Sequence, residues 1–166
     1  FVGYVKFANY ILKISKAPPT TYSEGFFFGY RWYDKHKVTP KFSFGHGLSY
    51  TTFSYGKLSI DGRTVSVDLT NTGKVDGAEV VQLYVGFGDQ KFGPDQREEP
   101  VKQLKGFEKY YLSPGESITA TFTLTDRDLS YWNVDSKSWS LKVGKADISV
   151  GSSSSDIRSN GVMNVQ

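Results

Sequence analysis

Apolar and polar residues alternate along the chain after about residue 48, and this pattern predicts a series of short β-strands. Val65, Val67 and Leu69 alternate with polar neighbours, as expected of a strand that buries one face. An Asp-Gly pair at 61–62 precedes this run, and both residue types tolerate the positive φ angles of a tight turn. The stretch GKLSIDGRTVSVDLT is therefore predicted to form a β-hairpin.

Later segments continue the strand pattern. Residues 78–87 are apolar on both faces, which predicts a central strand, and residues 101–112 predict a strand with a bulge at Gly106. Residues 116–125 alternate cleanly, and residues 146–150 are expected to close the sheet. Short strands with Gly, Pro, Asn and Asp turns, and no helical period after residue 50, predict an all-β sandwich.

The two ends of the chain have a different texture. Residues 1–16 are apolar in places but too short to span a bilayer, and they are expected to form a packed helix or a strand pair. Residues 17–21, Ala-Pro-Pro-Thr-Thr, predict an extended connector. Residues 22–47 are dense in aromatic rings and glycine, and such rings need a surface to pack on. Residues 151–166 are serine-rich and are expected to form a loosely ordered tail.

Composition excludes several classes of function. The 166 residues include no cysteine, so disulfides, thiolate metal sites and a cysteine nucleophile are ruled out. The net charge of +3, without a Lys/Arg run, does not indicate a nucleic-acid partner. Glycine-rich phosphate loops are absent, so nucleotide binding has no support. Neither a signal peptide nor a membrane segment is predicted, and a start at Phe1 leads us to expect a fragment or a processed product.

Candidate catalytic groups are few. Three carboxylate pairs could serve glycosidic hydrolysis, and we interpret each as solvated carboxylates in turns: Asp76 with Glu79, Glu98 with Glu99, and Asp126 with Asp128. His36 and His46 are the two histidines, and no spacing of ligands around them predicts a metal site or a cofactor. No serine lies in a Gly-x-Ser-x-Gly turn, and a packing role for His46 is favoured over catalysis.

Residues 129–143 predict a hairpin with a tryptophan on each arm. Tyr131, Trp132 and Trp139 could form a carbohydrate-binding platform, because aromatic faces stack on the apolar faces of sugars. The pattern favours a different role, in which the two tryptophans fill the core of the sandwich.

Several motifs occur in an ordered series between about Thr21 and Arg158. They are TYSEGFFFGYRWYD, FSFGHGLSYTTFSY, NTGKVDGAEVVQLYV, EPVKQLKGFEKYYLSPGESITATFTLTDRDLSYWNV and ISVGSSSSDIR. Together they resemble the C-terminal end of family 3 glycoside hydrolases, which include secreted β-glucosidases and β-xylosidases. The segment LSYWNVDSKSW is most similar to fungal β-glucosidases.

The resemblance implies a domain plan. Residues 1–45 would be a remnant of a preceding α/β domain and linker, residues 46–158 a fibronectin type III-like sandwich, and residues 159–166 a tail. In the family the aspartate nucleophile and the glutamate acid/base lie upstream, and neither motif occurs in this sequence. No catalytic residue carries over to this chain, which is expected to be inactive alone. The resemblance also implies an extracellular location.

The resemblance further implies a joint between domains. The residues expected to pack at this interdomain seam are Phe26, Phe28, Tyr30, Trp32, Phe44 and His46. The expected partners are the catalytic domains of a parent hydrolase, which the module would stabilise. Two other functions remain open: an independent module that binds polysaccharide or lignin, and a protein-interaction domain with no sugar role.

Overall fold

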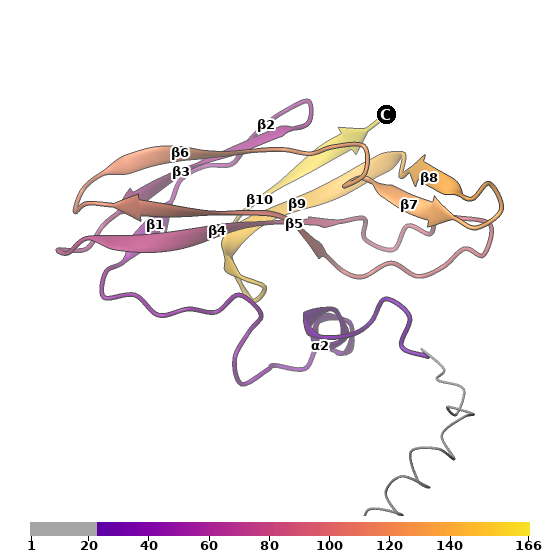
Figure 1. Ribbon diagram of the computed structural model, residues 1–166, viewed down its shortest axis with the longest axis horizontal. Coiled ribbons are helices and arrows are strands. Elements are labelled where there is room, and N and C mark those ends of the chain that lie inside the picture. The colour runs from indigo at the N-terminus through magenta and orange to yellow at the C-terminus, as the bar shows by residue number, and fades with distance from the viewer. Residues whose placement is uncertain (1–22) are drawn as a thin grey trace, which may run out of the picture.

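The computed structural model describes residues 23–166, which form two facing β-sheets with a short helix beneath one of them (Figure 1). This arrangement confirms the all-β sandwich. The elements are α2 Tyr30–His36, β1 Phe53–Tyr55, β2 Ser59–Asp61, β3 Thr64–Asn71, β4 Gly77–Gly86, β5 Gln103–Leu112, β6 Ser117–Thr123, β7 Ser130–Asn133, β8 Ser138–Leu141, β9 Gly144–Ser153 and β10 Asp156–Val165. The segment at 1–16 and the connector at 17–21 lie outside the described residues.

The first sheet is built around β3. Strand β6 pairs along one edge of β3, and β1 and β2 pair with successive parts of its other edge. The predicted hairpin between β2 and β3 is confirmed, because Asp61 pairs with Thr64 and Gly62 has a φ angle of 55°. Such a conformation costs glycine little and most other residues considerably more.

The second sheet has the order β10-β9-β4-β5, with antiparallel pairing throughout. Strand β4 is central, as its apolar pattern predicts. The predicted bulge in β5 is also present: Leu83 pairs with Gly106 and Tyr84 pairs with Leu104, so Lys105 has no partner in the register.

The hydrophobic core lies between the inner faces of the two sheets. Its alternating members on β3 and β4 are nearly inaccessible to solvent: Val65, Val67, Leu69, Val81, Leu83 and Val85. Each buried side chain of this kind contributes about 1.5–3 kcal/mol relative to an exposed one. Burial of the alternating apolar side chains of β3 and β4 is therefore a main source of stability for the sandwich.

The C-terminal residues are a strand rather than a tail. Residues 159–166, predicted as a tail, fall mostly within β10, which pairs with β9 along most of its length. Met163 and Val165 of β10 are buried in the core. Strand β9 is consequently internal, which corrects the expectation that residues 146–150 close the sheet. The serines at 152–155 belong to the end of β9 and the β9–β10 turn, and they mask the alternation that follows in β10.

Residues 23–50 run along the outer face of the second sheet, below β4 and β5 in Figure 1. The helix α2 corrects the expectation of a wholly irregular extension, and it ends at Lys37 in a left-handed conformation. The backbone N–H of Leu104 donates to the Tyr30 hydroxyl at 2.8 Å, and Gln82 Nε2 donates to the Gly45 carbonyl at 3.1 Å. This cover explains why β4 is buried on both faces.

Candidate functional site

The extension presents a concentration of exposed apolar side chains. Of the eighteen large hydrophobic side chains that are exposed in the described residues, nine lie between residues 26 and 50. We call these nine the extension face: Phe26, Phe28, Trp32, Tyr33, Val38, Phe42, Phe44, Leu48 and Tyr50. Leu48 and Tyr50 are 94% and 101% exposed, so their side chains contribute little to packing within the sandwich.

The six residues predicted for an interdomain seam divide into two groups. Tyr30 packs on the outer face of the second sheet, where its ring lies 6.0 Å from that of Tyr84, and Phe44 stacks on Tyr30 at 4.7 Å. Phe26, Phe28 and Trp32 are exposed on the extension face, as His46 is on the loop that follows Phe44. A role for all six at a domain interface stays a prediction.

The Phe44-Gly45-His46-Gly47 stretch is a tight turn held against β4. The N–H of His46 donates to the Ser43 carbonyl at 3.0 Å, and Gly45 has a φ angle of 80°. A side chain at Gly45 would collide with Gln82, so this position requires glycine for space as well as for conformation. The imidazole of His46 stacks loosely on Phe42 at 6.0 Å.

Two ion pairs attach α2 to the sandwich. Lys102 Nζ lies 2.7 Å from Asp34 Oδ2, and both side chains are mostly buried. Lys35 Nζ lies 2.7 Å from Glu98 Oε2 in the loop before β5. Together with the Tyr30 hydrogen bond, these contacts give the extension face a defined position on the sheet.

Glu99 and Lys142 form a buried ion pair. Their N···O distance is 2.7 Å, and each side chain is 4% exposed. This finding corrects the interpretation of Glu98 and Glu99 as a pair of solvated carboxylates, because Glu98 is exposed and Glu99 is not. Glu98 therefore binds Lys35 of α2, whereas Glu99 binds Lys142 in the interior.

The remaining candidate carboxylates also have separate partners. Glu79 is half-buried and accepts a hydrogen bond from the Tyr55 hydroxyl at 2.8 Å, and burial raises the pKa of Glu79. Asp126 pairs with Arg63, whereas Asp128 accepts from the backbone N–H of Thr125 at 2.9 Å. Glu79 lies within β4 and is half-buried, which corrects its interpretation as a solvated carboxylate in a turn.

The tryptophan hairpin is formed by β7 and β8, with Trp132 paired opposite Trp139. The two side chains are 41% and 44% exposed, so the expectation that they fill the core is wrong. The hairpin forms a separate two-stranded sheet, and its rings pack edge to face at 5.4 Å and 62°. Tyr131 turns to the other side and stacks on Phe92 at 6.0 Å. The proposed platform of three rings is therefore not a single flat surface.

Comparison with known proteins accounts for this architecture. A model of the fibronectin type III-like domain matches residues 79–154. The chain is 39% identical to probable β-glucosidase D of Aspergillus niger over 96% of its own length and 24% of that protein. It is 46% identical to thermostable β-glucosidase B of Acetivibrio thermocellus over 82% of its own length and 18% of that protein.

Solved structures agree with these sequence matches. The β-D-glucoside glucohydrolase of Trichoderma reesei superposes with a TM-score of 0.78 at 40% identity, over 89% of this chain and 23% of that one. A GH3 β-glucosidase of Bifidobacterium adolescentis gives a TM-score of 0.79 at 37% identity, over 87% of this chain and 21% of that one. This chain carries the fibronectin type III-like domain of family 3 β-glucosidases. It spans about a quarter or less of the curated relatives named above.

Some residues that shape this fibronectin type III-like domain gave no clear signal in the sequence. Lys142 lies between apolar residues at the end of β8, and its pairing with Glu99 depends on contact between distant segments.

Within residues 23–166, no cluster of three His, Asp or Glu side chains is arranged to hold a metal ion. No helix in that part of the chain is long and apolar enough to cross a membrane.

Proposed function

We propose that this chain is a non-catalytic module that stabilises the catalytic domains of a β-glucosidase-like glycoside hydrolase. The extension face would pack against those domains. This proposal depends mainly on one observation: within residues 23–166, half of the exposed large hydrophobic side chains lie on residues 26–50. A concentration of exposed apolar side chains in one segment is typical of an interaction site.

The anchoring of the extension supports the same proposal. A surface held by hydrogen bonds and ion pairs loses little conformational entropy when a partner binds, so more of the interaction energy is retained. Tyr30, Asp34 and Lys35 provide these attachments. Leu48 and Tyr50 project from the adjoining segment, where a second domain would bury them.

The parent enzyme would hydrolyse β-glucosides and act outside the cell. Relatives named β-glucosidases, which are similar across most of this chain, support the proposed reaction. The catalytic groups would belong to the parts of the parent enzyme that this chain does not match.

A chimaera tests the stabilising role. This chain would replace the matching segment of the Trichoderma reesei enzyme, and thermal unfolding would be followed with and without the double substitution Leu48→Ser, Tyr50→Ser. We expect the substitutions to lower the Tm of the chimaera, because they remove apolar surface from the interface. In the 166-residue chain alone the same change should have little effect, because both side chains are already exposed.

Val162→Ser provides a matched control. Val162 is 56% exposed on β10, outside the extension face, and its substitution should leave the Tm of the chimaera unchanged. An equal loss of Tm from the control and the double variant would contradict a specific interface on the extension face. So would a double variant with an unchanged Tm.

The exposed tryptophans support a second candidate, a module that binds polysaccharide or lignin. Retention of the chain on insoluble cellulose and on lignin, compared with that of a Trp139→Ala variant, tests this candidate. Loss of retention in the variant would support it, and a parent chain that is not retained on either material would remove it.

A further inference from the structure

Arg127 is an exposed cation mounted on an aromatic ring. Its guanidinium carbon lies 3.3 Å from the centroid of Trp139. Among the described residues it forms no ion pair with a carboxylate, and no hydrogen bond from its side chain is present. Stacking orients the guanidinium and leaves its N–H edge available for a planar anion.

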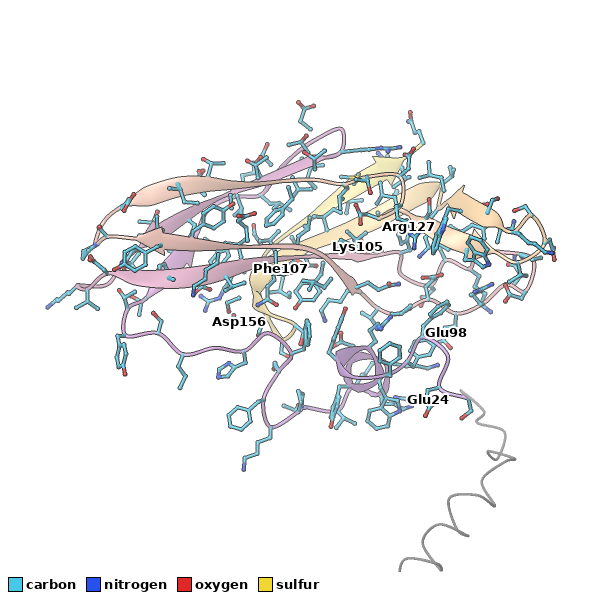
Figure 2. The ribbon with its side chains drawn as sticks, viewed as in Figure 1. Glu24, Glu98, Lys105, Phe107, Arg127 and Asp156 are labelled. Carbon is cyan, nitrogen blue, oxygen red and sulfur yellow. The ribbon has the colours of Figure 1, made fainter. Side chains whose placement is uncertain are left out.

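Lys105 supplies a second positive charge near Arg127. It occupies the unpaired position of the β5 bulge, is mostly buried, and has no ion pair within residues 23–166. Burial and the neighbouring charge of Lys142 lower the pKa of Lys105, and Arg127 acts in the same direction. Figure 2 shows Lys105 and Arg127 beside each other in its view, near the tryptophan hairpin.

Nearby carboxylates leave this positive charge incompletely compensated. Glu99 is already paired with Lys142 at 2.7 Å. Asp128 accepts hydrogen bonds from the backbone and the hydroxyl of Thr125 at 2.9 Å and 2.6 Å. Arg127, Lys105 and Lys142 nevertheless carry three positive charges against the two negative charges of Glu99 and Asp128, so an additional anion would find a net positive charge here.

Trp132 adds an open aromatic ring to this group. Arg127 covers one face of Trp139, whereas Trp132 is 41% exposed and has no cation over its ring among the described residues. The two indole centroids are 5.4 Å apart. A sugar stacked on Trp132 would thus hold a carboxylate substituent within reach of Arg127.

We propose that Trp132, Trp139, Arg127 and Lys105 form a binding site for a uronic acid unit, a sugar that carries a carboxylate. The sugar ring packs on Trp132, and the carboxylate accepts hydrogen bonds from Arg127 and Lys105. This site deepens the second candidate function and narrows its ligand to acidic saccharides. A neutral glucan would leave the excess positive charge without a counter-charge, which gives the site a basis for selectivity.

Titration of the whole chain with trigalacturonic acid and with cellotriose tests the site, read by calorimetry and by tryptophan fluorescence in a Trp32→Phe background. We expect the acidic trimer to bind more tightly than the neutral one. Arg127→Gln should weaken binding of the acidic trimer about tenfold, because a charge-assisted hydrogen bond is lost. Lys105→Gln should weaken it in the same direction, and added salt should weaken it further.

Lys145→Gln is the matched control, because Lys145 is exposed on β9 and lies outside the proposed site. Circular dichroism establishes that each variant remains folded. Equal binding of both trimers, no binding of the acidic trimer, or equal losses in Arg127→Gln and Lys145→Gln would overturn the proposal. Retention on cellulose without binding of the acidic trimer would contradict this inference alone and leave the broader carbohydrate-binding candidate standing.

Discussion

At the scale of single residues, Glu99 and Lys142 form the most buried ion pair among the described residues. Both side chains are almost fully removed from water, so each charge depends on the other for compensation. The ammonium group also lies 4.9 Å from the ring of Phe87. The pair ties the loop before β5 to the end of β8, which are 43 residues apart in sequence.

Glu99→Gln should therefore destabilise the chain strongly. The substitution leaves Lys142 as an uncompensated buried charge, and we expect a loss of about 3–5 kcal/mol in the free energy of unfolding. Urea denaturation followed by circular dichroism measures this loss. Asp126→Asn breaks the exposed pair with Arg63 and serves as control, with an expected loss of less than about 1 kcal/mol. Equal losses of unfolding free energy in the two variants would contradict the larger contribution of the buried pair.

Glu79→Gln should change how stability depends on pH. Burial raises the pKa of Glu79 above its ordinary value of 4.5, so the folded chain binds more protons than the unfolded chain between the two pKa values. Stability from this group therefore falls as the pH rises through that window. The change in unfolding free energy caused by Glu79→Gln should therefore be more favourable at neutral pH than below pH 4.5.

Urea denaturation across a pH series measures this effect for Glu79→Gln and for Glu108→Gln. Glu108 is exposed on β5 and provides a carboxylate that remains in water. Its substitution should show no comparable gain at neutral pH. A benefit of Glu79→Gln that is larger in acid than at neutral pH would reverse the predicted sign and contradict burial as the cause.

At the scale of elements, β10 shows what local patterns can and cannot predict. The hairpin of β2 and β3, the central strand β4 and the bulge in β5 follow from alternation and turn residues, which act over a few positions. Local patterns do not predict strand β10, because a serine-rich turn precedes it, although Met163 and Val165 alternate toward the core.

Met163→Ala tests the contribution of β10 to the core. Met163 is 3% exposed, and its truncation should cost about 2–5 kcal/mol of unfolding free energy through lost burial and a cavity. The adjacent Val162 faces outward, and Val162→Ala should change stability by no more than about 0.5 kcal/mol. Denaturant titration of both variants provides the comparison. A Met163→Ala variant as stable as Val162→Ala would contradict a structural role for this strand.

At the scale of the whole molecule, the candidate site was only partly predictable. The density of rings in residues 22–47 predicts that a surface is needed for packing, but it does not indicate which rings the sandwich itself uses. Tyr30 is held by Leu104 and Tyr84, which are distant in sequence, whereas Tyr50 remains fully exposed. The exposure of Trp132 likewise depends on the hairpin standing apart from the two main sheets.

The arrangement of carboxylates leads to a last prediction about the whole chain. Retaining hydrolysis of a glycoside requires two carboxyl groups about 5–5.5 Å apart on either side of the sugar. Here Glu98 pairs with Lys35, Glu99 with Lys142, and Glu79 with Tyr55. Each acid is thus committed to a separate structural contact, and the purified chain should hydrolyse an aryl β-glucoside no faster than buffer does. Hydrolysis that co-purifies with the folded chain and falls on Glu79→Gln would show instead that one of these acids reaches a substrate.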